Sequence, residues 1–207
     1  MTASDALLSD LQWDRSNDVV NDGSAMPEFE QDSDKKVSDA KDASYDDEIW
    51  SELVSKLSAD RAMQLVRQGG YATIQADDIG LPATTDKDGT SGISGTLVGG
   101  QSAMAYPVEA VMACTWNTDL LYEMGLSLGE DSINTGVAGW YAPGVDIHRS
   151  PYSGRNFEYF SEDGFLSGQL AGNEVKGARE KGVITYMKHF ALNDQETNRY
   201  CLLYTSD

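Results

Sequence analysis

The stretch Gly139–Arg199 decides the fold of this chain. It begins GWYAPGVDIHRSPYSGRNFEYFSEDGFLSG, continues through a helical run, and ends GVITYMKHFALNDQETNR. Two strand-like runs, 137–142 and 183–187, flank that helix, and each is followed by a dense cluster of polar residues. Parallel strands that alternate with helices bring such clusters to one rim of the sheet, at the carboxyl ends of the strands. The pattern therefore predicts an α/β enzyme with its site at this rim.

Helical signals surround these strands. Asn117 or Thr118 can cap a long helix that ends at Gly136, and Gly182 follows another helix with an acidic first turn and a basic last turn, as the helix dipole favours. Apolar residues at helical spacing predict two shorter helices nearer the amino terminus, the second capped by Ser58. We therefore expect helices over four segments: 49–57, 59–68, 118–135 and 162–181.

The candidate strands lie near residues 83, 112, 138 and 184, and the segment near 112 (VMACTW) fits a helix or a strand. We expect the glycine-rich turn after the first of them to hold Asp86 and Asp88. Strands and helices that alternate in this way form a parallel sheet or a barrel. About four units make roughly half of an eight-unit barrel, and a half barrel has open edges. The expected fold is α/β, the N-terminal part of a (β/α)8 TIM barrel that is incomplete in this chain.

The composition of residues 1–45 differs from that of the rest. This segment is rich in Asp and Ser and poor in apolar residues, and such a segment rarely buries enough surface to offset the entropy of ordering it. We expect an acidic, poorly ordered segment or an interdomain linker, with the end of an upstream domain as the alternative. Residues 46–199 would then form the portion of the barrel.

The charge of the chain narrows its possible partners. The net charge is −19, and residues 1–48 hold 14 Asp and Glu against 4 Lys and Arg. An acidic chain without a basic cluster is a poor candidate for binding nucleic acid or anionic lipid, whereas a neutral, hydroxyl-rich substrate tolerates the charge. No stretch is long enough to span a membrane. The amino terminus MTASDALLSD lacks the pattern of a signal peptide, which favours a cytoplasmic protein.

The cysteines and the absent motifs exclude several kinds of site. Cys114 and Cys201 form neither a disulfide framework nor a metal-ligand spacing, and Cys114 lies in an apolar run where we expect a buried thiol. The sequence contains no GxSxG, HExxH or P-loop motif and no GxGxxG after a strand. We therefore expect no metal and no cofactor.

Asp88 and Arg155 are candidates for binding a polar ligand. The carboxylate of Asp88 can accept hydrogen bonds from two neighbouring hydroxyls, or it can close its own turn as an Asx residue. The guanidinium of Arg155 can donate to two oxygens of a ligand, or it can pair with Glu158 or Asp163 and hold its loop. The residues themselves leave both alternatives open.

The adjacent pair Lys188-His189 is the strongest local signal. A basic pair at the end of a strand is costly to bury unless it has partners, which favours a role in the site. The alternative is a lysine at the rim and a histidine whose hydrogen bonds are satisfied in the core. His148, beside Arg149, lacks such a context, and we expect it to be a loop or packing residue.

Three motifs in the same order resemble the N-terminal barrel domain of glycoside hydrolase family 3, the β-glucosidase family. They are DGTSGI after LPATTD, GRNFEYFSED, and KHFALNDQETNR, and the resemblance extends from Ile49 to about Arg199. The family fold is a (β/α)8 barrel followed, or in permuted members preceded, by an α/β sandwich domain. The family turn usually reads DGP, and DGT in this chain keeps the aspartate.

The resemblance implies that Asp88, Arg155, Lys188 and His189 hold the hydroxyls of the sugar in the −1 subsite. Members are retaining enzymes with a carboxylate nucleophile and a second carboxyl as acid/base. The family nucleophile is an aspartate in an SDW-like motif later in the barrel, and the acid/base is usually a glutamate of the other domain. We therefore assign no catalytic residue within this chain. A chain truncated in this way would bind sugar poorly and hydrolyse nothing by itself.

The resemblance thus implies hydrolysis of terminal non-reducing β-D-glucosyl residues by the full-length protein, with a carbohydrate as its partner. KHFALND differs from the KHFPGHG of the N-acetylglucosaminidase branch and argues against that branch. A β-xylosidase or another exo-glycosidase of the same family, and a non-catalytic sugar-binding module, are the alternatives. Residues 200–207, YCLLYTSD, do not fit the family, and we interpret them as an artefactual tail.

Overall fold

The computed structural model describes residues 28–94, 103–197 and 199, so the predictions for residues 1–27 and for the tail 200–207 lie outside the described residues. The helices and strands follow one another along the chain in this order: η2 (Val37–Ala40), α2 (Glu48–Lys56), α3 (Ala59–Arg67), β1 (Ala72–Thr73), η3 (Asp77–Ile79), β2 (Thr84–Asp88), α4 (Glu109–Ala113), α5 (Thr118–Thr135), β3 (Gly139–Tyr141), η4 (Asn156–Glu158), α6 (Gly164–Glu180) and β4 (Ile184–Thr185), where η denotes a 3₁₀ helix.

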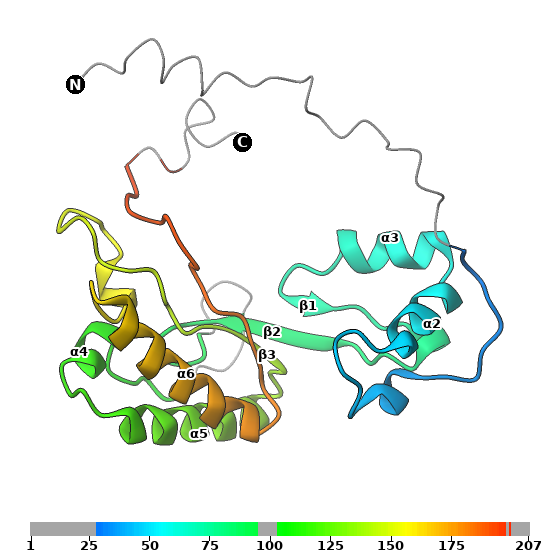
Figure 1. Ribbon diagram of the computed structural model, residues 1–207, viewed down its shortest axis with the longest axis horizontal. Helices are drawn as coiled ribbons and strands as arrows, with labels where there is room; N and C mark the ends of the chain where they lie inside the picture. Colours follow the sequence, from blue (N-terminus) through cyan, green and yellow to red (C-terminus); the bar gives the residue numbers. More distant parts are fainter. Residues whose placement is uncertain (1–27, 95–102, 198, 200–207) are drawn as a thin grey trace, which may run out of the picture.

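The strands form one sheet in the order β1-β2-β3-β4. β2 and β3 are parallel, as are β3 and β4, whereas the short β1 is antiparallel to β2. α5 leads into β3 and α6 leads into β4, and these two helices lie side by side along the parallel strands (Figure 1). The α/β class is confirmed, and three parallel strands with their helices correspond to part of a (β/α)8 barrel.

Helix α5 begins and ends where the sequence predicts, whereas α6 begins at Gly164, two residues later than predicted, and has no acidic residue in its first turn. The side chain of Asn117 accepts hydrogen bonds from two backbone N–H groups of the first turn of α5, and Gly136 ends that helix with φ of 70°. Asp163 caps α6 in the same way, and Gly182, directly after its cap residue Lys181, has φ of 87°. A side-chain cap satisfies N–H groups that have no partner within the helix, and glycine adopts positive φ without strain.

α5 and α6 pack closely through glycines. A Cβ atom placed on Gly125 would lie 2.1 Å from the carbonyl oxygen of Glu174, and one on Gly177 would lie 2.2 Å from that of Tyr122. Leu121, Met124 and Leu128 of α5 are buried, whereas Leu120 and Ile133 are exposed because the contact with α6 covers only a narrow stripe of the helix.

A substitution at this contact is expected to destabilise the protein. Gly177→Ala introduces a methyl group that has no room beside the backbone of α5, so we expect the free energy of unfolding to fall by about 1–3 kcal/mol. Gly168→Ala is the matched control, because a Cβ there meets no atom within 4 Å and alanine favours a helix by up to about 1 kcal/mol. Urea denaturation measures both, and equal stabilities for the two variants would contradict the close packing.

For the middle of the chain, the structure settles one open alternative and overturns two predictions. The segment near residue 112, which fits a helix or a strand, is the helix α4, in which Met112 and Ala113 face the core. Helical spacing then turns Cys114 away from the core, and its thiol is exposed. Asp86 and Asp88 belong to β2 and not to a turn, because their backbones pair in register with Gly139 and Tyr141 of β3.

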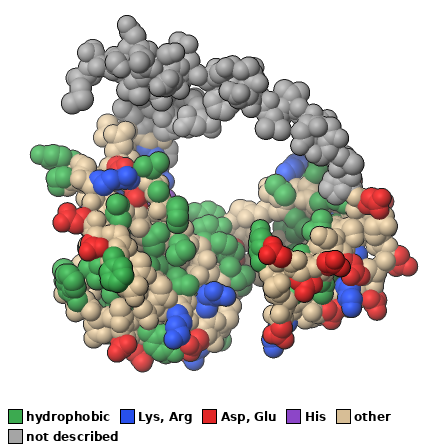
Figure 2. All heavy atoms as spheres, viewed as in Figure 1, with side chains coloured by type: hydrophobic (Ala, Val, Ile, Leu, Met, Phe, Trp, Pro, Cys, Tyr) green, Lys and Arg blue, Asp and Glu red, His purple; other side chains and the backbone are tan. Residues whose placement is uncertain are grey.

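The amino-terminal elements build a second, smaller core. Leu53 and Leu57 of the α2 segment are buried together with Ile79 and Ala40. Residues 28–45 therefore contain the 3₁₀ helix η2 and contribute the buried Ala40, although their composition predicted little order. β2 joins this part to the part formed by α5 and α6 (Figure 1). Acidic side chains gather on the part formed by η2, α2 and α3 (Figure 2).

Within the described ranges, no helix is both long and apolar enough to cross a membrane.

Candidate functional site

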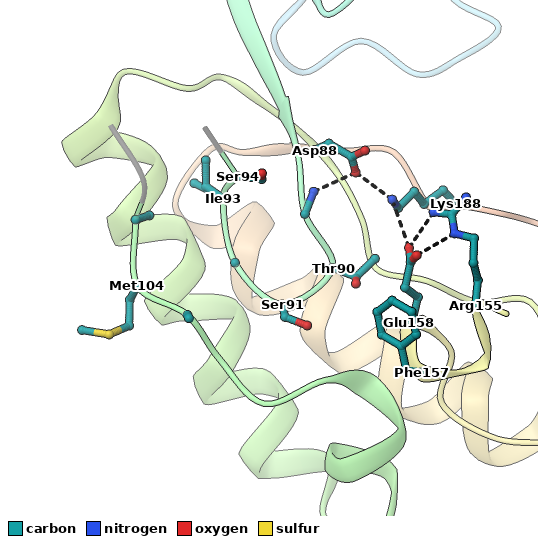
Figure 3. A pocket seen from close by; sticks show the side chains of 14 residues that line it. Asp88, Thr90, Ser91, Ile93, Ser94, Met104, Arg155, Phe157, Glu158 and Lys188 are labelled. Carbon is teal, nitrogen blue, oxygen red and sulfur yellow. Dashed lines mark hydrogen bonds and ion pairs between the residues drawn. The ribbon is translucent and has the colours of Figure 1, made fainter. Parts of the chain in front are cut away.

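A cavity of about 620 Å³ lies where β2 ends and the loop after β3 approaches the segment after β4. Its lining comes from four pieces of the chain: 88–94, 103–105, residues 155, 157 and 158 of the loop, and Lys188. Figure 3 shows the charged side chains of these pieces converging on one side of the cavity. The carboxyl ends of the parallel strands thus position the site, as the alternation of strands and helices predicts.

Asp88 and Lys188 form the first ion pair of the site. Asp88 is the last residue of β2, and a bridge between Gly144 and Lys188 continues the parallel pairing beyond β4. Lys188 Nζ lies 2.7 Å from Asp88 Oδ1, which also accepts a hydrogen bond from the N–H of Gly89 at 2.7 Å. Among the described residues, Asp88 Oδ2 has no hydrogen-bond partner. One carboxylate oxygen is therefore held by the protein, and the other is free to accept from a ligand.

Arg155 and Glu158 form the second ion pair. Arg155 Nε donates to Glu158 Oε1 at 2.6 Å, and Nη2 donates to Oε2 at 2.8 Å, so the pair is bidentate. Lys188 Nζ lies 3.3 Å from Glu158 Oε2 and joins the two pairs (Figure 3). The hydrogen bonds to Glu158 raise the pKa of Arg155. Burial acts to raise the pKa of Glu158, but Arg155 and Lys188 outweigh it, and the pKa is lowered.

His189 lies at the end of this row of charges. Its Nδ1 lies 2.7 Å from the hydroxyl oxygen of Tyr159, which accepts a hydrogen bond from Asn193 at 2.6 Å. Arg155 Nη1 lies 3.4 Å from His189 Nε2. Burial, followed by the charges of Arg155 and Lys188, lowers the pKa of His189. The lowered pKa favours the neutral imidazole at pH 7. In a neutral imidazole one ring nitrogen donates a hydrogen bond and the other accepts one.

The loop that carries Arg155 is held by His148. The ring Nε2 of His148 lies 2.7 Å from the carbonyl oxygen of Asn156 and 2.9 Å from that of Tyr159, so this nitrogen donates. The prediction that His148 is a loop or packing residue is confirmed. The N–H of Asn193 donates to Asp146 Oδ2 at 2.9 Å, which ties the segment after β4 to the same loop.

The structure brings together all four residues that the sequence singles out, Asp88, Arg155, Lys188 and His189. Of the open alternatives, the local contacts are present, because the N–H of Gly89 donates to Asp88 and Arg155 pairs with Glu158. Binding of a ligand by Asp88 or Arg155 stays a prediction. Asp163 is no partner of Arg155, because it caps α6.

The sequence does not indicate the supporting residues Tyr159 and Asn193, and it indicates Glu158 only as a possible partner of Arg155. The spacing of three residues between Arg155 and Glu158 was a visible signal for an ion pair, but nothing local indicated that Glu158 also reaches Lys188. The contact of Tyr159 with Asn193 spans 34 residues and depends on how the loop folds. In the described part of the chain, no group of three or more His, Cys, Asp or Glu side chains is placed to hold a metal ion.

The arrangement suits a ligand that carries several hydroxyl groups. It offers a carboxylate oxygen as acceptor and ammonium and guanidinium groups as donors, with the imidazole of His189 beside them, and all are held by further contacts within the protein. A hydroxyl both donates and accepts, so such alternating groups can bind neighbouring hydroxyls in pairs. Hydrogen bonds to charged groups contribute about 1.5–3 kcal/mol each.

The match to a known family agrees with this chemistry. The model of the glycosyl hydrolase family 3 N terminal domain matches residues 48–199. The chain therefore belongs to glycosyl hydrolase family 3.

Relatives of this chain are β-glucosidases. β-Glucosidase A of Butyrivibrio fibrisolvens is 38% identical over 148 residues, which are 72% of this chain and 18% of that protein. Probable β-glucosidase I of Aspergillus clavatus is 43% identical over 130 residues, or 62% of this chain and 16% of that protein. The structure of β-glucosidase 3B from Thermotoga neapolitana in complex with glucose matches with a TM-score of 0.62 and 39% identity, covering 71% of this chain and 24% of that one. The chain thus spans less than a quarter of the length of each relative.

Proposed function

We propose that this domain serves an exo-acting β-glucosidase, which removes terminal non-reducing β-D-glucosyl residues from β-glucosides by a retaining mechanism. The observation that carries the proposal is the cavity whose wall holds Asp88, Lys188, Glu158 and Arg155 in one connected row. His189 does not line the cavity and lies behind this row, 3.4 Å from Arg155. The β-glucosidase relatives, one of them solved with glucose, support this choice of substrate.

In this proposal the chain supplies part of the −1 subsite, which holds the terminal sugar. Asp88 Oδ2 accepts from a sugar hydroxyl, while Lys188 and Arg155 donate to hydroxyl oxygens. The neutral imidazole of His189 is the fourth sugar-binding group. These groups bind and orient the ring. They thereby bring its anomeric carbon to the position where a nucleophile can attack it.

The nucleophile and the acid/base come from other parts of the protein in this proposal, and the chain by itself is inactive. A retaining glycosidase needs two carboxyl groups about 5–5.5 Å apart, one of them protonated when the bond breaks. Asp88 and Glu158, the carboxylates in the cavity wall, both pair with Lys188. Arg155 and Lys188 lower the pKa of Glu158, so Glu158 is not suited to protonate the leaving oxygen.

The choice of sugar can be tested with two aryl glycosides. We expect the protein that contains this domain with a complete barrel to hydrolyse an aryl β-glucoside with kcat/KM at least about tenfold higher than the matching β-xyloside, which lacks the CH2OH group. The reverse ratio would identify a β-xylosidase of the same family. Glucose binding without turnover of either substrate would identify a sugar-binding module.

A further inference from the structure

Glu158 connects the two cations of the site. Its Oε1 accepts from Arg155 Nε, and its Oε2 accepts from Arg155 Nη2 and lies 3.3 Å from Lys188 Nζ. The side chain of Glu158 is only 11% exposed, compared with 27% for that of Asp88. Figure 3 shows its carboxylate directed at Arg155 and Lys188. Glu158 is thus engaged by the protein on both oxygens, whereas Asp88 keeps one oxygen free.

The local backbone explains this position. Arg155 precedes the 3₁₀ helix η4 and Glu158 is its last residue, and the N–H of Glu158 donates to the carbonyl of Arg155 at 3.0 Å. Residues three apart are eclipsed in a 3₁₀ helix, so the two side chains lie on the same side of the turn. The hydrogen bonds of His148 to the carbonyls of Asn156 and Tyr159 hold this turn in place.

The charges of the site alternate because of Glu158. The order along the row is Asp88, Lys188, Glu158 and Arg155, so each cation has a carboxylate beside it. Without the charge of Glu158, the ammonium and the guanidinium would repel each other across a partly buried space. Glu196, whose Oε1 lies 3.6 Å from Arg155 Nη1, would then be the remaining carboxylate partner of Arg155. Its charge would attract the guanidinium away from Lys188.

We propose that Glu158 is a positioning residue of the sugar site, which holds Arg155 and Lys188 side by side so that their remaining N–H groups reach the same ring. This inference rests on the proposed glycosidase function. Glu158 does not touch the sugar itself. It acts by fixing two donors that do, at the spacing of neighbouring hydroxyls.

The kinetic test uses Glu158→Gln in the complete enzyme with an aryl β-glucoside. We expect kcat/KM to fall about 10- to 100-fold, with KM raised at least fivefold, since roughly 1.4 kcal/mol is a factor of ten. A variant that is merely less folded would lower kcat and leave KM unchanged. Glu162→Gln is the control, because Glu162 is exposed and follows the same loop. Kinetics of Glu158→Gln within twofold of the wild type would overturn the inference.

A second variant and a second measurement keep the test decisive. If Glu158→Gln does not fold, Glu158→Asp keeps the charge but is too short to bridge both cations, and we expect a three- to tenfold rise in KM. The NMR signal of the Arg155 Nε–H can be followed in this chain without any turnover. We expect Glu158→Gln to shift and broaden it, and an unchanged signal would overturn the inference. A wild-type enzyme that neither hydrolyses glycosides nor binds glucose would instead refute the proposed function.

Discussion

Replacing Lys188 with methionine is expected to lower kcat/KM for an aryl β-glucoside about 100-fold in the complete enzyme. Lys188 Nζ lies 2.7 Å from Asp88 and 3.3 Å from Glu158, so it is the cation that separates two carboxylates. Methionine keeps the volume but removes the charge. Under the proposed function, the variant loses a charge-assisted hydrogen bond to the sugar, worth about 1.5–3 kcal/mol. It also leaves two partly buried carboxylates without their common partner.

The same substitution at an exposed lysine is the control. Lys176 lies on α6 with its Nζ 5.3 Å from the ring centroid of Tyr122, remote in sequence from the cavity residues. Lys176→Met should leave kcat/KM within twofold of the wild type.

We also expect His189→Ala to lower kcat/KM at least about tenfold, because it removes the imidazole that Tyr159 orients. Near-normal kinetics of Lys188→Met or His189→Ala would refute the role of that residue in binding the sugar.

The stability of the protein is expected to decrease as the pH rises from about 5 to 8. The reason is a pair of glutamates, Glu109 in α4 and Glu174 in α6, both of which are fully buried. Glu109 Oε2 and both carboxylate oxygens of Glu174 have no hydrogen-bond partner among the described residues. Glu109 Oε1 accepts one hydrogen bond, from the N–H of Gly144 at 3.3 Å. Such groups are stable in the core only when they are protonated.

The sign of the pH dependence follows from the pKa values. Burial raises the pKa of Glu109 from 4.5 to about 8, and burial together with the charge of Glu109 raises the pKa of Glu174. Between pH 4.5 and 8 the folded protein therefore holds more protons than the unfolded chain. The stabilisation is complete below pH 4.5 and is lost as the pH rises toward 8. Carboxylates with lowered pKa, such as Glu158, lose their contribution only at lower pH.

Thermal unfolding at a series of pH values measures this effect. We expect the midpoint to fall by about 5 °C or more between pH 5 and pH 8, since 1 kcal/mol corresponds to about 2–4 °C in a protein of this size. Glu174→Gln, which cannot ionise, should flatten the dependence and be the more stable protein at pH 8. The exposed Glu123→Gln is the matched control and should follow the wild type. A wild-type midpoint that rises over this range would contradict the buried pair.

The elements that the sequence predicted well are those set by neighbouring residues. Asn117 and Ser58 cap helices by accepting from N–H groups two or three residues further on, and such contacts depend only on neighbouring residues. The predictions stayed open or were wrong where packing decided between local alternatives. The segment before Cys114 became a helix because of how it packs, and the backbone of Asp88 became strand because it pairs with Tyr141.

The sequence by itself determined the long helices, the α/β class and the identity of the four polar residues at the strand ends, because caps, periodicity and motifs are local patterns. Only the tertiary structure decided that these residues form one row joined by Glu158. Asp88 and Lys188 are 100 residues apart and meet only because β2, β3 and β4 lie parallel and end at the same rim. The burial of Glu109 against Glu174 was likewise hidden, because a charged residue within a helix gives no local sign of the face that will be covered.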